Sequence, residues 1–192
     1  MFKKCILASV VLLLGVLVAK VVATPQPVVY YTFDELIAKV ADASGNGNEG
    51  TPKGDVKLNN DGKIGKSFEF NGKNAYVELK RVVQDDFTLM AWIKTDKPGI
   101  RLGDQGYQGS GLIWSDVGVV TNDFILAVLG TKLSFFCGNP DLSVNSDKDV
   151  VTGKWVHVAA TRNAKQAKIA IYIDGKLEKT LNHPNKGSLN AI

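Results

Sequence analysis

The sequence predicts an all-β protein built as an antiparallel sandwich of two sheets. Three observations support this prediction. Short runs of β-branched and aromatic residues recur along the chain, turn-forming residues separate them, and the stretch 155–175 contains two runs that each alternate between two faces. Short strands at regular spacing with turn chemistry between them are typical of a sandwich or a barrel.

The stretch 155–175 predicts a β-hairpin with one apolar face. Asp174-Gly175 is a residue pair suited to positive φ, so 176–181 is expected to pair back as a third antiparallel strand. A sheet with an apolar face needs a second layer to cover it. The residues expected on the apolar face are Val156, Val158, Ala160, Ile169, Ile171 and Ile173.

The other elements follow in order from the N-terminus. An opening strand is expected at 28–33, and 34–41 is compatible with one or two helical turns capped by Asp34. Turn formers then dominate, which ends any helix. No long helix is expected, and no linker or repeat divides the chain. The remaining expected strands are 55–58, 66–70, 75–79, 87–94, 111–115, 123–129 and 133–137.

Residues 1–23 have the pattern of a signal peptide. Lys3 and Lys4 precede an apolar run at 5–19, and small residues at 21–23 suit cleavage after Ala23. The mature protein is then expected to begin at Thr24 and to be secreted, periplasmic or on the cell surface. Lys20 leaves an uncleaved signal anchor as the alternative, although the run is short for a membrane span.

The mature chain is nearly neutral. The full sequence has a formal net charge of +4, but residues 1–23 hold three lysines and no acidic residue, which leaves a net charge of about +1. This balance gives no support to a nucleic-acid partner or an anionic membrane surface. Cys137 is the single mature cysteine, either a small buried apolar residue beside two phenylalanines or a thiol for an intermolecular bridge.

Several motifs resemble one known family. The run W-V-H-V-A-A-T followed by I-Y-I-D-G, together with segments at 42–50, 70–72, 76–77 and 87–94, resembles the laminin-G-like jelly-roll domains of the concanavalin A-like lectin/glucanase superfamily. The resemblance implies one jelly-roll domain over 24–192.

The end of the chain departs from the family's pattern. Domains of this resemblance close with further strands where this sequence stops, at 187–192. The resemblance therefore implies that the final strands are missing and that 28–33 has an open edge. Open edges pair with other chains, so residues 24–192 alone are expected to be marginally stable and to associate.

A calcium site is expected in the loop 42–48. Asp42, Asn46 and Asn48 place oxygen-bearing side chains at alternate positions between glycines, and hard oxygen ligands favour calcium. The resemblance adds Asp34 as an acid from the first strand. Calcium is then expected to raise the melting temperature more than magnesium does. The alternative is that these side chains satisfy the backbone of a turn.

The sequence contains no pattern typical of an active site. His157 lies within an expected strand, where a packed, hydrogen-bonded ring is the simpler interpretation, and His183 precedes a proline in a loop. The glucanase branch of the family carries its acids on one strand as E-x-D-x-E, because alternate residues share a face. That pattern is absent here, and the protein is predicted not to be an enzyme.

The expected function is recognition. The resemblance implies a glycan as the first-choice ligand and an extracellular protein as the second; the alternatives are a polysaccharide-active enzyme and an accessory domain without its own glycan ligand. Trp92 is expected to point away from the core, and Tyr107 lies in a glycine-rich loop. These two aromatic residues are the candidates for ligand binding.

Overall fold

The computed structural model describes residues 24–115 and 121–190, so the predicted signal peptide lies outside the described residues. The described part forms short strands and one 3₁₀ helix, and none of its helices has the length and apolar composition needed to cross a bilayer. The elements are β1 (Thr51–Lys53), β2 (Lys57–Asn59), β3 (Ser67–Glu69), β4 (Tyr76–Glu78), β5 (Phe87–Ile93), η1 (Gly106–Gln108), β6 (Ser110–Ser115), β7 (Phe124–Leu129), β8 (Lys132–Cys137), β9 (Leu142–Asp149), β10 (Val156–Asn163), β11 (Lys168–Ile173) and β12 (Lys176–Asn182).

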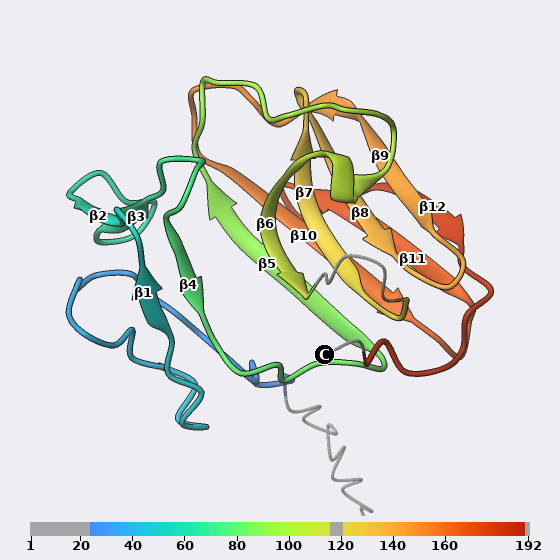
Figure 1. Ribbon diagram of the computed structural model, residues 1–192, viewed down its shortest axis with the longest axis horizontal. Coiled ribbons are helices and arrows are strands. Elements are labelled where there is room, and N and C mark those ends of the chain that lie inside the picture. The colour runs from blue at the N-terminus through green and yellow to red at the C-terminus, as the bar shows by residue number, and fades with distance from the viewer. Residues whose placement is uncertain (1–23, 116–120, 191–192) are drawn as a thin grey trace, which may run out of the picture.

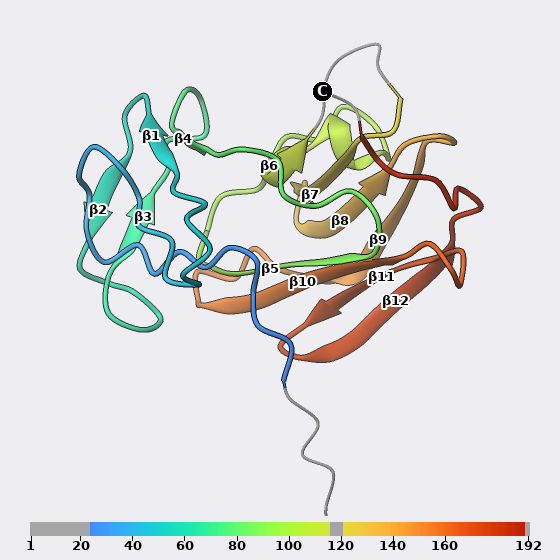
Figure 2. The ribbon, with the colours of Figure 1, turned by 90° about the horizontal axis from the view of Figure 1, so that it is seen from below.

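Two four-stranded sheets face each other and confirm the predicted sandwich (Figure 2). The β10 sheet has the order β12-β11-β10-β5, the β8 sheet has the order β6-β7-β8-β9, and every pairing is antiparallel. Apolar side chains from both sheets form one core between them, with Phe87 from β5 against Phe124 from β7 and Phe135 from β8.

The predicted hairpin is confirmed as the centre of the β10 sheet. β10 and β11 pair in the expected antiparallel register, and all six residues expected on the apolar face are buried in the core. Asp174 and Gly175 have φ of 50° and 74°, which produces the tight turn into β12. On its other side β10 pairs with β5, from far earlier in the chain, so that Ile93 lies opposite Val156 and Phe87 lies opposite Arg162.

The opening strand expected at 28–33 is wrong. The segment pairs with no strand in the described part of the chain. Its backbone bonds instead to the loop that follows, because the Tyr30 N–H donates to the Asp42 carboxylate over 2.9 Å. A φ of 60° at Phe33 also interrupts the extended run. The open strand edge expected there therefore does not exist as such, while the tendency to associate stays a prediction.

The helical turn expected at 34–41 is also wrong. Asp34 does not cap a helix, because its carboxylate accepts the Lys66 N–H over 2.8 Å. Val40 and Gly50 form an isolated antiparallel bridge in place of a helical turn. The segment leads into two small sheets beside the sandwich, β1 with β4 and β2 with β3 (Figure 1).

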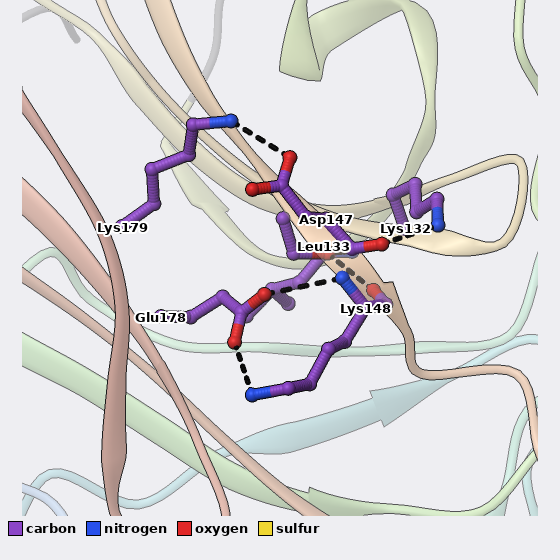
Figure 3. A network of polar contacts seen from close by, with 7 residues as sticks. Lys132, Leu133, Asp147, Lys148, Glu178 and Lys179 are labelled. Carbon is purple, nitrogen blue, oxygen red and sulfur yellow. Dashed lines mark hydrogen bonds and ion pairs between the residues drawn. The ribbon is translucent and has the colours of Figure 1, made fainter.

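Ion pairs join the two sheets along the edge where β9 and β12 meet. Figure 3 shows Glu178 of β12 accepting from Lys148 of β9 over 2.7 Å, and Lys179 reaching Asp147 over 2.8 Å. The Glu178 side chain is only 6% exposed and also accepts the Lys148 N–H. Hydrogen bonds from Lys148 lower the pKa of Glu178. This charge-assisted contact stabilises the edge because the Glu178 carboxylate is largely shielded from water.

Arg162 joins the last described segment to the residues just before β5 through hydrogen bonds. The residue is 2% exposed, and its guanidinium donates to the carbonyls of Asp85, Asn185 and Gly187 over 2.6–3.0 Å. Immediately beyond, the fully buried Leu189 donates its N–H to Gln84 over 2.7 Å. The described residues up to Leu189 are therefore part of the packed domain.

Candidate functional site

The outer face of the β10 sheet, turned away from the core, carries an apolar row that crosses all four strands. Met90 lies opposite Ala159, Ala159 opposite Tyr172, and Tyr172 opposite Leu177. Met90 is 58% exposed and Leu177 is 57% exposed, although both are large apolar residues. Ala159 between them is 7% exposed and Tyr172 is half-buried, so the row exposes large apolar side chains at its two ends, which favours a contact surface.

Polar side chains line a shallow depression beside this row. The next row across the sheet contains Thr88, Thr161 and Thr180, whose hydroxyls lie on the outer face. The depression has a volume of about 560 Å³. Its lining combines the aromatic residues Phe87 and Tyr172 with hydroxyl, amide and charged groups, which is the composition of a site for a polar ligand with an apolar face. The lining includes Thr88, Thr161, Asn163, Gln166, Lys168 and Tyr172.

Trp92 lies on the same outer face, four residues from Thr88 along β5, a separation of about 13 Å. Its side chain points outward and the residue is 41% exposed, as predicted from the alternation in this strand. The ring packs edge-on against His157, with centroids 5.2 Å apart, and the Lys63 Nζ lies 4.5 Å from the ring centroid. His157 is thus packed as expected, but against an exposed ring and only half-buried itself.

Tyr107 lies on the opposite side of the molecule from Trp92. It belongs to η1, which covers the outer face of the β8 sheet, and its ring packs against Phe136 with centroids 5.0 Å apart. Tyr107 is 43% exposed. The structure therefore does not bring the two predicted ligand-binding residues into one site.

Sequence reasoning did not select Tyr172 and the threonines of the depression. The signal was present, because Tyr172 alternates with the buried Ile171 and Ile173 and must point outward. What alternation could not provide was the order of the strands, which places Tyr172 beside Thr161 and Thr88. The candidate residues come from four separate strands, and the strand order β12-β11-β10-β5 is what brings them onto one face.

The loop 42–48 is organised around the Asp42 carboxylate. One oxygen accepts the N–H groups of Tyr30 and Ser44, and the other accepts the N–H of Asn48, all within 3.0 Å. Hydrogen bonding by the Ser44 side chain, and then by these backbone groups, holds the pKa of Asp42 well below its ordinary value. Asp42 therefore stays ionised and stabilises the turn as an anion surrounded by donors.

The other predicted metal ligands face different partners. Asn46 and Asn48 donate their amide N–H groups to the Val28 carbonyl over 3.1 and 3.0 Å. The side-chain nitrogens of both residues, and not their oxygens, therefore face the middle of the loop. Asp34 is bonded to Lys66. Within the described ranges, no three His, Cys, Asp or Glu side chains are grouped to hold a metal. This arrangement does not fit an oxygen cage for calcium without turning the amides.

We expect Asp42→Ala to lower the melting temperature by several degrees in chelator as well as in calcium. The substitution removes the acceptor of three backbone N–H groups whether or not a metal binds. Thermal unfolding of wild type and variant, each with EDTA and with millimolar calcium or magnesium, measures this. A loss that appears only in calcium would establish Asp42 as a metal ligand.

Two further residues singled out from the sequence are buried. His183 is 1% exposed, and its Nε2 lies 3.1 Å from the carbonyls of both Cys137 and Pro140. Cys137 is fully buried, which favours its role as a small core residue, and burial raises the pKa of its thiol to about 12. Neither side chain is placed to meet a substrate in the folded protein.

Comparisons with known proteins agree with this architecture. The family model described as the concanavalin A-like lectin/glucanases superfamily matches residues 71–191. A search of curated proteins found no match. The binding domain of Paraclostridial Mosquitocidal Protein 1 superposes with a TM-score of 0.61 at 17% identity, over 81% of this chain and 40% of that one. Domain 4 of AbnA, a GH43 extracellular arabinanase from Geobacillus stearothermophilus solved with arabinotriose, gives a TM-score of 0.57 at 19% identity, over 77% and 71%.

Proposed function

Because the chain belongs to the concanavalin A-like lectin/glucanase superfamily, we propose that it is a non-catalytic module that binds carbohydrate. The observation that supports this best is the outer face of the β10 sheet. There an aromatic and apolar row lies directly beside a depression lined with hydroxyl and amide groups. Sugars have the same two-sided character, since an apolar ring face adjoins a rim of hydroxyls.

Tyr172 is the residue proposed to contact a sugar ring at the depression. It is half-buried between the apolar row and the polar lining, so its ring is held in place and still reachable. Thr161 and Asn163 of the neighbouring β10 are proposed to bond to sugar hydroxyls. Trp92 lies at the far end of the same face. A ligand that contacts both Tyr172 and Trp92 must therefore span several sugar rings, which makes it an oligosaccharide. The domain solved with arabinotriose shares this fold, which supports a saccharide as the ligand class.

The proposal assigns the chain no glycoside hydrolysis by a pair of carboxylates. A retaining pair must lie about 5 Å apart around one bond. Glu78 pairs with Lys53 on the small β1–β4 sheet, and Glu178 is held by Lys148 between the two sheets. They belong to structural contacts in different parts of the fold. Export, expected from the sequence, remains part of the proposal, whereas calcium binding at the loop 42–48 would require the amides of Asn46 and Asn48 to turn.

Binding to a glycan array, followed by calorimetry on the best oligosaccharide, tests this function. We expect Tyr172→Ala to weaken binding by roughly tenfold or more, because a positioned aromatic anchor is lost. Tyr107→Ala makes the same change on the opposite face and should leave affinity unchanged.

The outcomes separate the possible sites and functions. Loss of binding with Tyr107→Ala alone would move the site to the β8 sheet. Turnover of a bound polysaccharide would overturn the non-catalytic assignment. Failure of the folded wild-type protein to bind any glycan would overturn carbohydrate recognition and favour a protein ligand for the exposed apolar row.

A further inference from the structure

Trp92 presents its ring together with a positive charge. The Lys63 ammonium lies over the ring at 4.5 Å from its centroid, a cation–π contact, and His157 packs against the ring edge. An approaching sugar therefore does not meet a bare aromatic surface at this end of the face. It meets a ring and an ammonium group that face the same volume of solvent.

Hydrogen bonds hold both ends of the loop that carries Lys63. On one side the Asp61 carboxylate accepts hydrogen bonds from Lys94 and, at 3.5 Å, from the Trp155 ring N–H. On the other side the Lys66 N–H donates to Asp34. Gly65 between them has a φ of 62°, and a side chain there would collide with the Asp34 carboxylate. The backbone that carries Lys63 is thus held beside Trp92 by the local fold.

Lys63 has no ion-pair partner among the described residues, whereas Lys94, which approaches the same loop, pairs with Asp61. The nearest acid in sequence, Asp61, already pairs with Lys94 and contributes little net negative charge. A neutral sugar that stacks on the capped face of Trp92 must displace the ammonium and gains no ionic contact in return. A sugar bearing an anionic group also moves the ammonium off the ring face, but it then forms an ion pair with that ammonium.

We propose that the Trp92 end of this face selects an anionic sugar residue, one that carries a carboxylate or a sulfate, with Lys63 as its counter-charge. The inference rests on the proposed carbohydrate function and specifies its ligand class. The Trp92 ring supports the sugar, and the Lys63 ammonium binds the anionic group. The depression around Tyr172 then holds the neighbouring residues of the same oligosaccharide.

Calorimetry with trigalacturonate and with its methyl ester tests the inference, because the two ligands share one sugar skeleton and esterification removes the negative charges. A sulfated galactotriose forms a third arm that distinguishes sulfate from carboxylate. We expect wild type to bind at least one anionic ligand roughly tenfold or more tightly than the ester. Lys63→Gln should remove this preference and leave ester binding unchanged or stronger. Lys66→Gln, which removes the same charge from the same loop away from the ring, should keep it.

The outcomes distinguish this inference from the proposed function. Equal affinity of wild type for the ester and both anionic ligands would overturn the selection of charge while carbohydrate binding stands. If Lys63→Gln and Lys66→Gln lose the preference for anionic ligands equally, the preference arises from the total positive charge of the loop, and the specific role of Lys63 is wrong. Binding of none of the three ligands, together with a blank glycan array, would overturn both proposals.

Discussion

Phe135→Ala is expected to lower the free energy of unfolding by about 3–5 kcal/mol and the melting temperature by roughly 10 °C. Phe135 is fully buried near the middle of β8, and its ring meets Phe87 edge-on with centroids 6.3 Å apart. Both sheets contribute to this contact, so the cavity left by the ring cannot close without moving one sheet toward the other. Urea denaturation of wild type and variant measures the loss.

Phe70→Ala provides the matched control for this prediction. The same atoms are deleted, but Phe70 is 45% exposed and lies in the N-terminal part, outside the sandwich. We expect its loss to cost about 1 kcal/mol or less. Similar losses for the two variants would contradict a single core between the β10 and β8 sheets.

Arg162→Ala is expected to cost about 2–4 kcal/mol and to release the segment 185–190 from the domain. The substitution removes the donor shared by the carbonyls of Asp85, Asn185 and Gly187 and leaves a void at the end of β10. Hydrogen exchange at the Leu189 N–H, which is bonded to Gln84, reports the release directly.

Arg162→Lys retains the charge but loses the planar fork that reaches several carbonyls at once. It should therefore lie between wild type and Arg162→Ala in stability. If Arg162→Ala unfolds within about 0.5 kcal/mol of wild type and the Leu189 N–H stays protected, the anchoring role of Arg162 is wrong.

The elements that could be predicted from the sequence are those whose burial follows a local pattern. β5 and the β10–β11 hairpin alternate because the core lies on one side of them, and β7 and β8 run apolar because both of their faces are buried. The bounds of these strands agree with the expected ranges to within a few residues. The outward position of Trp92 followed from the same alternation. Two strands were missed. β1 is a three-residue strand with a proline at its centre, and β9 has a polar and charged second half that forms its contacts through Lys148 and Asp147 at the sheet edge.

The incorrect predictions share a physical cause, which is that distant partners override local preference. The β-branched and aromatic run at 28–33 favours a strand, yet its backbone groups bond to the side chains of a loop more than ten residues later. Asp34 has the chemistry of a helix cap, yet it accepts from Lys66. Tyr172 belongs to the candidate site only because β11 lies between β10 and β12. None of these relations is encoded in neighbouring residues.

The pairing of β5 with β10 determines how the domain can form during synthesis. Phe87 meets Arg162, and Ile93 meets Val156, so β5 leaves the ribosome well before any residue that completes its sheet. During this interval the β7–β8 hairpin, whose residues are almost all buried in the final structure, is already made and has no opposing sheet. Pairings between distant segments form slowly, because a long loop must close before any contact compensates for its lost entropy. The nascent chain therefore passes through a stage in which half a sandwich is exposed, and this stage is where we expect chaperones to act.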